Sequence, residues 1–203
     1  MITKQTPIGL VLGSHMPAEA ITRTAAKAEE LGFGELWFSE DCFFTGAMSG
    51  VTAALSVTQR LPVGIGIVSA VTRHPAILAM ELATMSRLYP GRVLAGVGLG
   101  VPAWLDQMGI RPSSPLSAMR ECMTSVRRLL AGEQLTIEGK VHTFREVGLT
   151  HLPAEDIPIY TGIVNEKGLS LSGEIADGTV FSVLAGVDYI RWACEKIQEG
   201  AVV

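Results

Sequence analysis

The chain has 203 residues, of which 48% are hydrophobic and 18% charged, and its formal net charge is −4. This length and apolar content are sufficient for one domain with a substantial core. The small acidic excess leaves no basic surface for nucleic acid or for an anionic membrane, so we expect neither as a partner.

The amino-terminal segment lacks the apolar core of a signal peptide, and glycine or charge interrupts each long apolar run before it reaches spanning length. We therefore expect a cytoplasmic protein. The three widely spaced cysteines, Cys42, Cys122 and Cys194, indicate neither a disulfide framework nor a zinc site. No two of the scattered histidines have ligand spacing, so we predict no metal site.

Predicted strands and predicted helices alternate along the chain. The strands are predicted at residues 8–12, 35–38, 63–68, 93–99, 157–163 and 178–183. The helices are predicted at residues 17–31, 51–58, 75–88, 116–130, 166–175 and 187–197, with one further turn at 104–108. Residues 133–153 alternate weakly and are predicted to form a hairpin-like insertion before the fifth strand, within a single domain of residues 1–203.

Four helices carry an apolar stripe at intervals of three and four residues, which predicts one buried face on each. The stripes are Ile21, Ala25, Ala28 and Leu31; Leu78, Leu82, Met85 and Leu88; Leu116, Met119, Met123, Val126 and Leu130; and Val187, Ile190, Cys194 and Ile197.

Six strand–helix units in succession predict an α/β fold of the (β/α)8 TIM-barrel type, truncated after about six βα units. The two central strands are apolar on both faces, as in a buried parallel sheet. A full barrel takes about 250 residues, so we expect two strands to be missing at the carboxyl end. Because an open barrel exposes two strand edges, we expect a homo-oligomer, in the simplest case a dimer.

Glycines alternate along the two central strands, at Gly64 and Gly66 in one and at Gly96, Gly98 and Gly100 in the other. Positions without side chains let a flat ligand approach the backbone directly. The alternative is close packing within the sheet. This pattern is not the dinucleotide fingerprint: the spacing is Gly-x-Gly-x-Gly, and no helix begins at the third glycine.

Three segments together resemble the bacterial luciferase-like monooxygenase superfamily, in particular its branch that uses coenzyme F420, a deazaflavin. They are residues 36–46, with acids, a thiol and aromatic rings after the second strand, residues 63–75, and residues 91–104. The resemblance implies a flavin-type oxidoreductase on a barrel scaffold. It also implies a non-proline cis peptide between Gly66 and Ile67, where Ile67, beside Val68 and Ser69, backs the central ring of the cofactor.

The resemblance places Asp41 and Cys42 beside the cofactor, as the candidate catalytic residues. Asp41 alternatively caps its loop, and Cys42 alternatively serves as a small apolar wall residue. Sugar-phosphate dehydrogenases of this branch have a histidine in place of Cys42 and a glutamate in place of Val101. Both departures argue against that reaction, and the substrate stays an unidentified small organic molecule.

The resemblance places the cofactor phosphate after the fifth strand, at Gly162, Ile163, Val164 and Asn165. A helix begins there, and unpaired N–H groups at a helix amino terminus bind anions. Asn165 is equally suited to cap that helix. Gly98 and Gly100 are also assigned to the cofactor site.

These observations favour an oxidoreductase that transfers hydride between reduced coenzyme F420 and an organic substrate. One alternative is a monooxygenase that uses FMN and oxygen. Another is a flavin-binding or interaction protein without catalytic activity.

Overall fold

A seven-stranded parallel sheet forms the centre of the computed structural model, which describes residues 8–202. Its strands are β1 (Gly9–Leu12), β2 (Glu35–Phe38), β3 (Val63–Ile65), β4 (Val68–Ser69), β5 (Val93–Gly98), β8 (Ile159–Gly162) and β9 (Gly178–Thr179). The strand order is β1-β2-β3-β5-β8-β9, and β4 also pairs with β5. All six predicted strands are present, with the third divided into β3 and β4.

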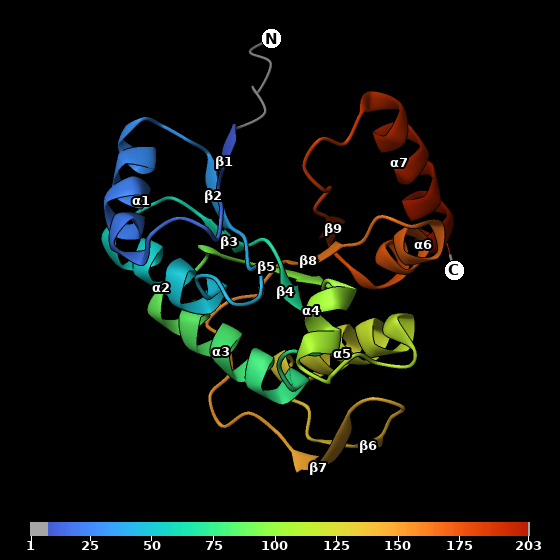
Figure 1. Ribbon diagram of the computed structural model, residues 1–203. Coiled ribbons are helices and arrows are strands. Elements are labelled where there is room, and N and C mark those ends of the chain that lie inside the picture. The colour runs from blue at the N-terminus through green and yellow to red at the C-terminus, as the bar shows by residue number, and fades with distance from the viewer. Residues whose placement is uncertain (1–7, 203) are drawn as a thin grey trace.

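Helices connect the successive strands. They are α1 (Ile21–Glu30), preceded by the 3-10 turn η1 (Ala18–Ala20), then α2 (Ala47–Val57), α3 (Pro75–Leu88), α4 (Pro102–Gln107), α5 (Pro115–Leu130), α6 (Glu166–Ile175) and α7 (Val187–Ala201). Figure 1 shows α1, α2, α3 and α5 following one another around the outside of the sheet, with α6 and α7 beyond β8 and β9. The predicted α/β class with a parallel sheet is confirmed.

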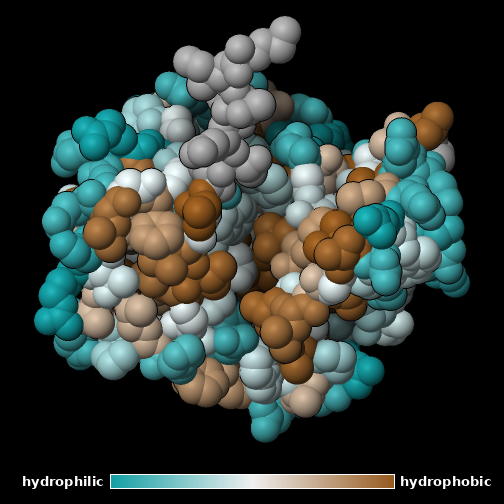
Figure 2. Space-filling view, turned by 90° about the horizontal axis from the view of Figure 1, so that it is seen from above, coloured by the Kyte–Doolittle hydropathy of each residue, from teal (hydrophilic) through white to brown (hydrophobic). Residues whose placement is uncertain are grey.

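The sheet is open. Strands β1 and β9 are the two ends of its order, and no pairing joins them within residues 8–202. Seen from above, the molecule is hollowed between the part that carries α1 and the part that carries α7, and hydrophobic side chains lie on both sides of the hollow (Figure 2).

An antiparallel hairpin of β6 (Leu135–Glu138) and β7 (Thr143–Val147) lies apart from the main sheet (Figure 1). The Glu121 carboxylate of α5 accepts hydrogen bonds from the backbone N–H groups of Lys140, Val141 and His142, at 2.9–3.0 Å. The hairpin turn is thereby fixed to α5. The description of residues 1–203 as one domain with an insertion at 133–153 stays a prediction.

Several predicted boundaries were wrong. Helix α2 begins at Ala47 rather than Val51, because the Glu40 carboxylate, in the loop between β2 and the helix, accepts the Ala47 N–H at 3.0 Å and so satisfies one N–H group of the first turn. The turn predicted at 104–108 is the helix α4, which begins at Pro102. Strand β9 has only two residues, and Leu184, beyond it, has a φ of 64° and is fully exposed.

Four stripe residues predicted to be buried are exposed: Leu31 is 64%, Leu88 61% and Val187 65% accessible, and Cys194 is exposed as well. Leu31 and Leu88 lie at the ends of their helices, beyond the contact with the sheet. Helix α7 packs on α6 through Ala193 and Gly200 instead of through Cys194, which is exposed. Gly200 lies directly against the backbone carbonyl of Ser170, and such a close approach needs a residue without a side chain.

Candidate functional site

A pocket of about 510 Å³ lies where β2, β4, β5 and β8 end. The carboxyl ends of parallel strands meet at one edge of a sheet, which is where ligand sites of such folds form. All the predicted site residues except Gly98 line it: Asp41, Cys42, Gly66, Ile67, Val68, Ser69, Gly100, Gly162, Ile163, Val164 and Asn165. The structure therefore brings together segments that are up to 124 positions apart in the sequence.

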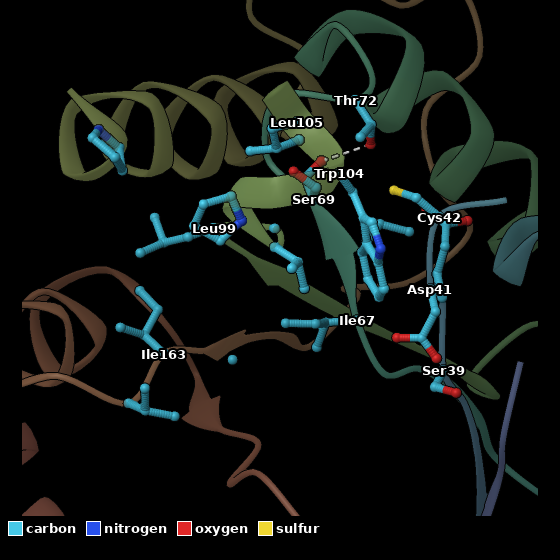
Figure 3. A pocket seen from close by; sticks show the side chains of 18 of the residues that line it. Ser39, Asp41, Cys42, Ile67, Ser69, Thr72, Leu99, Trp104, Leu105 and Ile163 are labelled. Atoms are coloured by element: carbon cyan, nitrogen blue, oxygen red, sulfur yellow. Dashed lines mark hydrogen bonds between the residues drawn. The ribbon is translucent and has the colours of Figure 1, made fainter. Parts of the chain in front are cut away.

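The peptide bond between Gly66 and Ile67 is cis, as the resemblance implied, and it separates β3 from β4. Hydrogen bonds hold the backbone on both sides of it: the Gly66 N–H donates to the Phe38 carbonyl at 2.9 Å and the Ala70 N–H to the Gly98 carbonyl at 2.8 Å. Figure 3 shows Ile67 lying between Trp104 and Asp41 on one side and Ile163 on the other.

The alternating glycines make room for neighbouring side chains. A Cβ atom on Gly98 or Gly162 would collide with the Ile67 side chain, and one on Gly64 would collide with the Trp37 ring. At Gly64 and Gly98, therefore, the absence of a side chain serves close packing within the sheet. Gly98 is not among the residues that line the pocket, because the Ile67 side chain and the Gly162 carbonyl lie directly against it; its assignment to the cofactor site stays a prediction.

Gly100 has a φ of 79° and lies against the Ser69 hydroxyl and the Leu105 side chain. The positive φ and the lack of a Cβ atom allow the chain to turn from β5 into α4 at this point. The turn brings α4 over the pocket and keeps Gly100 and Ser69 in its wall.

Two carboxyl groups, those of Glu40 and Asp41, lie at the end of the pocket near β2. The Arg73 guanidinium donates to Glu40 at 2.7 and 3.0 Å, and Arg73 Nε lies 3.5 Å from Oε2 of Glu81. Asp41 accepts a hydrogen bond from the Ser14 hydroxyl. Glu40 is thus committed to Arg73 and to the start of α2, whereas Asp41 keeps more of its hydrogen-bonding capacity for a ligand.

Burial raises the pKa of the Cys42 thiol, and the neighbouring carboxylates of Glu40 and Asp41 raise it further. Arg73 opposes this effect. The thiolate is the nucleophilic form of cysteine, and the raised pKa keeps the thiol protonated. Cys42 is therefore better suited to be a small residue of the pocket wall than a nucleophile.

At the opposite end of the pocket, Asn165 caps α6: its side chain accepts the Gly168 N–H at 2.9 Å. The predicted cap is confirmed. The Gly168 N–H is therefore already used, and Glu166 places a carboxylate in the first helical turn. An anion bound here would contact the earlier backbone N–H groups of residues 163–167.

Sequence reasoning missed a large part of the pocket wall, contributed mainly by the connection from β5 to α5. The missed lining residues are Ser39, Glu40, Thr72, Leu99, Val101, Pro102, Trp104, Leu105, Arg111, Pro112, Pro115 and Ser182. Pro102 was a usable signal, because proline favours the first position of a helix and here begins α4.

Within residues 8–202, no three histidine, cysteine or acidic side chains come close enough to hold a metal ion together. None of the helices in this described part of the chain combines the length and the apolar character that a membrane crossing requires.

A family model described as luciferase-like monooxygenase matches residues 2–202. A 5,10-methylenetetrahydromethanopterin reductase of Methanolobus tindarius is 31% identical over 185 residues, which are 91% of this chain and 56% of that protein. An F420-dependent glucose-6-phosphate dehydrogenase of Microbacterium testaceum is 29% identical over an alignment of 165 residues, and the match covers 75% of this chain and 49% of that protein. The chain thus spans about half the length of these curated relatives.

The solved structure of the coenzyme F420-dependent tetrahydromethanopterin reductase of Methanopyrus kandleri has a TM-score of 0.87 and 27% sequence identity to this chain. The similarity covers 97% of this chain and 61% of that one. It confirms the barrel-type α/β fold and the open sheet as part of such a barrel. The match over nearly all residues, together with the cis peptide and the pocket beside it, leads to one conclusion: the chain belongs to the luciferase-like monooxygenase family.

Proposed function

We propose that this chain forms the cofactor-binding part of an oxidoreductase that uses coenzyme F420. The observation that carries the proposal is the open pocket at the carboxyl ends of β2, β4, β5 and β8, with Ile67 between its two ends. The relatives at 27–31% identity support it, because those whose names state a cofactor are F420-dependent.

When bound, the deazaflavin supplies or accepts a hydride. Ile67 gives the ring an apolar support, and Val68 and Ser69 border it on the same strand. Apolar side chains that hold a flat ring in one place reduce the orientational freedom that hydride transfer must otherwise overcome. Gly66 and Gly100 also line the pocket beside the ring.

The segment Gly162, Ile163, Val164 and Asn165 holds the cofactor phosphate through backbone N–H groups at the start of α6. Asp41 lies at the other end of the pocket, where it orients the substrate by accepting a hydrogen bond. Cys42 completes the wall beside it as an uncharged thiol.

A titration experiment tests the cofactor. The purified protein is titrated with F420 and with FMN, and binding is followed by cofactor fluorescence. We expect saturable F420 binding that is at least about tenfold tighter than FMN binding, which corresponds to about 1.4 kcal/mol. Tighter FMN binding would favour the oxygen-using alternative, and binding of either cofactor without turnover on any substrate would favour the non-catalytic one.

A substitution of Ile67 tests whether F420 binds in this pocket or elsewhere on the protein. Ile67→Ala removes the apolar support and should weaken F420 binding, whereas Val183→Ala, at an exposed position outside the pocket, should leave it unchanged. Equal affinities of the two variants would refute the assignment of the site.

The substrate is proposed to be a small organic molecule, and the assembly a homodimer formed where the sheet is open. Sedimentation equilibrium at several protein concentrations measures the assembly. A monomer at all of them would refute the dimer.

A further inference from the structure

The pocket has two chemically different ends. Figure 3 shows Ile67 between them, with Ile163 toward one end and Trp104, Asp41 and Cys42 toward the other. The end near Ile163 lies at the start of α6, and the proposed function assigns it to the cofactor phosphate. The end near Trp104 is therefore open to the substrate, and the inference drawn from it rests on the proposed function.

Trp104 occupies a fixed position. It lies in α4, where Pro102 fills the first helical position and Leu105 is only 3% exposed. The Met108 N–H donates to the Trp104 carbonyl at 3.1 Å, and the Ile110 N–H donates to the Leu105 carbonyl at 3.0 Å. The turn that carries the indole is thus held by packing and by hydrogen bonds, and the indole lines the pocket from it.

The side chains around Trp104 are mostly apolar. Val101, Pro102 and Leu105, its neighbours along the chain, line the pocket, and the lining also includes the apolar side chains of Leu99, Pro112 and Pro115. Its hydroxyl groups are partly used within the protein: the Thr72 hydroxyl donates to the Ser69 carbonyl at 3.2 Å, as the dashed line in Figure 3 shows. Walls of this kind bind apolar and aromatic groups, and a few polar groups fix their orientation.

The charges at this end disfavour a phosphorylated substrate. Two acidic side chains, those of Glu40 and Asp41, line the pocket. Among the lining residues that the structure describes, Arg111 carries the positive charge. Arg111 is paired with Asp106 at 2.8 Å, and Arg73, behind the pocket, is committed to Glu40. A phosphate dianion would therefore meet carboxylates with little free positive charge to offset them.

We propose that the end of the pocket bordered by Trp104 and Asp41 binds an unphosphorylated substrate that presents a flat, unsaturated ring to the Trp104 indole. A conjugated carbonyl ring fits this description. The reduction would add one hydride, supplied by the reduced deazaflavin, to a ring carbon and one proton, supplied by water, to the other atom of the double bond; the proton that the cofactor loses on oxidation would neutralise the hydroxide left by that water.

Calorimetric titration tests the proposal, with 2-cyclohexen-1-one as the flat unsaturated probe and glucose 6-phosphate as the phosphorylated one. The variant is Trp104→Ala. Its matched control is Trp192→Ala, which removes another half-buried indole that packs on Tyr189 in α7, outside the pocket. Trp104→Phe keeps an aromatic face, and far-UV circular dichroism shows whether each variant folds.

We expect the unmodified protein and Trp192→Ala to bind cyclohexenone equally, and Trp104→Ala to bind it about tenfold more weakly, since aromatic contact contributes about that factor. Trp104→Phe should recover most of the affinity. Glucose 6-phosphate should bind more weakly than the enone. Tighter binding of glucose 6-phosphate, or equal enone affinity of the Trp104→Ala and Trp192→Ala proteins, would overturn the proposal.

The cofactor titration is run on the same variants. F420 affinity should change less than enone affinity in Trp104→Ala; the reverse would mean that the indole contacts the cofactor and would overturn the substrate assignment. Failure of the unmodified protein to bind F420 would overturn the proposed function, while the enone titration without cofactor would still decide which class of molecule the Trp104 end prefers.

Discussion

The guanidinium of Arg73 donates two hydrogen bonds to the carboxylate of Glu40, at 2.7 and 3.0 Å, across 33 positions of the sequence. Their side chains are 23% and 13% exposed, so this pair is largely withdrawn from water. It joins the loop after β2 to the loop before α3. Both loops border the pocket, so the pair fixes the position of the pocket wall that carries Asp41 and Cys42.

Replacing Arg73 by Gln should destabilise the fold by about 2–4 kcal/mol, because Glu40 and Glu81 then share a poorly solvated region without a compensating charge. Urea unfolding measures the change. The control is Arg191→Gln, which breaks an exposed pair with Asp188 and should cost less than about 1 kcal/mol. Similar losses in the two variants would show that the Arg73 pair behaves as an ordinary surface pair.

Gly98→Ala should destabilise the protein by about 1–3 kcal/mol, because the new methyl group meets the Ile67 side chain. Ile67→Ala removes that obstacle, so the cost of Gly98→Ala should fall by at least about 1 kcal/mol in the double variant. The matched control is Gly96→Ala. Its methyl group would also meet the Ile65 carbonyl, which is backbone and stays in place, so Ile67→Ala should relieve much less of its cost.

Denaturation curves of these single and double variants give the two coupling energies. If Ile67→Ala relieved both alanine substitutions equally, the Ile67 side chain would not be the group that requires glycine at position 98.

The Glu29 carboxylate should contribute a pH-dependent part of the stability. The backbone N–H of Arg60 lowers the pKa of Glu29, and those of Gln59 and Leu61 lower it further against an opposing effect of burial. A pKa below that of the unfolded chain means that the contribution is complete above the unfolded value of about 4.3 and is lost as the pH falls through the folded value.

Glu29→Gln should therefore be less stable than the unmodified protein at pH 6, and the difference should shrink as the pH is lowered toward 3. Urea unfolding across this range measures it. Glu30→Gln, beside it in α1, removes only an exposed contact with Lys27 and should show little effect at any pH. A difference that stayed constant down to pH 3 would contradict the role of the Glu29 charge.

The three cysteines should react with iodoacetamide in a fixed order at pH 8. Cys194 is exposed and should react first. Cys42 should react more slowly, since burial and its acidic neighbours raise the pKa of its thiol. Cys122 should be protected in the folded protein, because burial raises its pKa to about 12. Mass spectrometry of timed digests measures each rate, and Cys42 reacting as fast as Cys194 would indicate an activated thiol.

Much of the fold could be predicted because the pattern is local. The apolar runs at β3 and β5 and the helix between them specify a parallel crossover within 40 residues. Asn165 could likewise be identified as a helix cap from its immediate neighbours, and its side chain accepts the Gly168 N–H of the helix that follows. The resemblance added the cis peptide, which periodicity alone does not reveal.

The predictions that failed concerned contacts that a helix makes with residues outside it. The early start of α2 results from Glu40, which lies before that helix in the loop after β2. The exposure of Val187 results from how α7 packs on α6 through Ala193 and Gly200, a choice that a stripe of larger apolar residues does not indicate.

The sequence by itself determined the order of the strands and helices, the parallel sheet and the segments that meet at its carboxyl edge, because hydrophobic periodicity and caps act within a few turns of chain. Only the tertiary structure decided which glycines face a ligand and which face Ile67, and that Trp104 borders the pocket. Those properties depend on which side chain from another strand or helix fills a given space, and the spacing of residues along one segment carries no information about it.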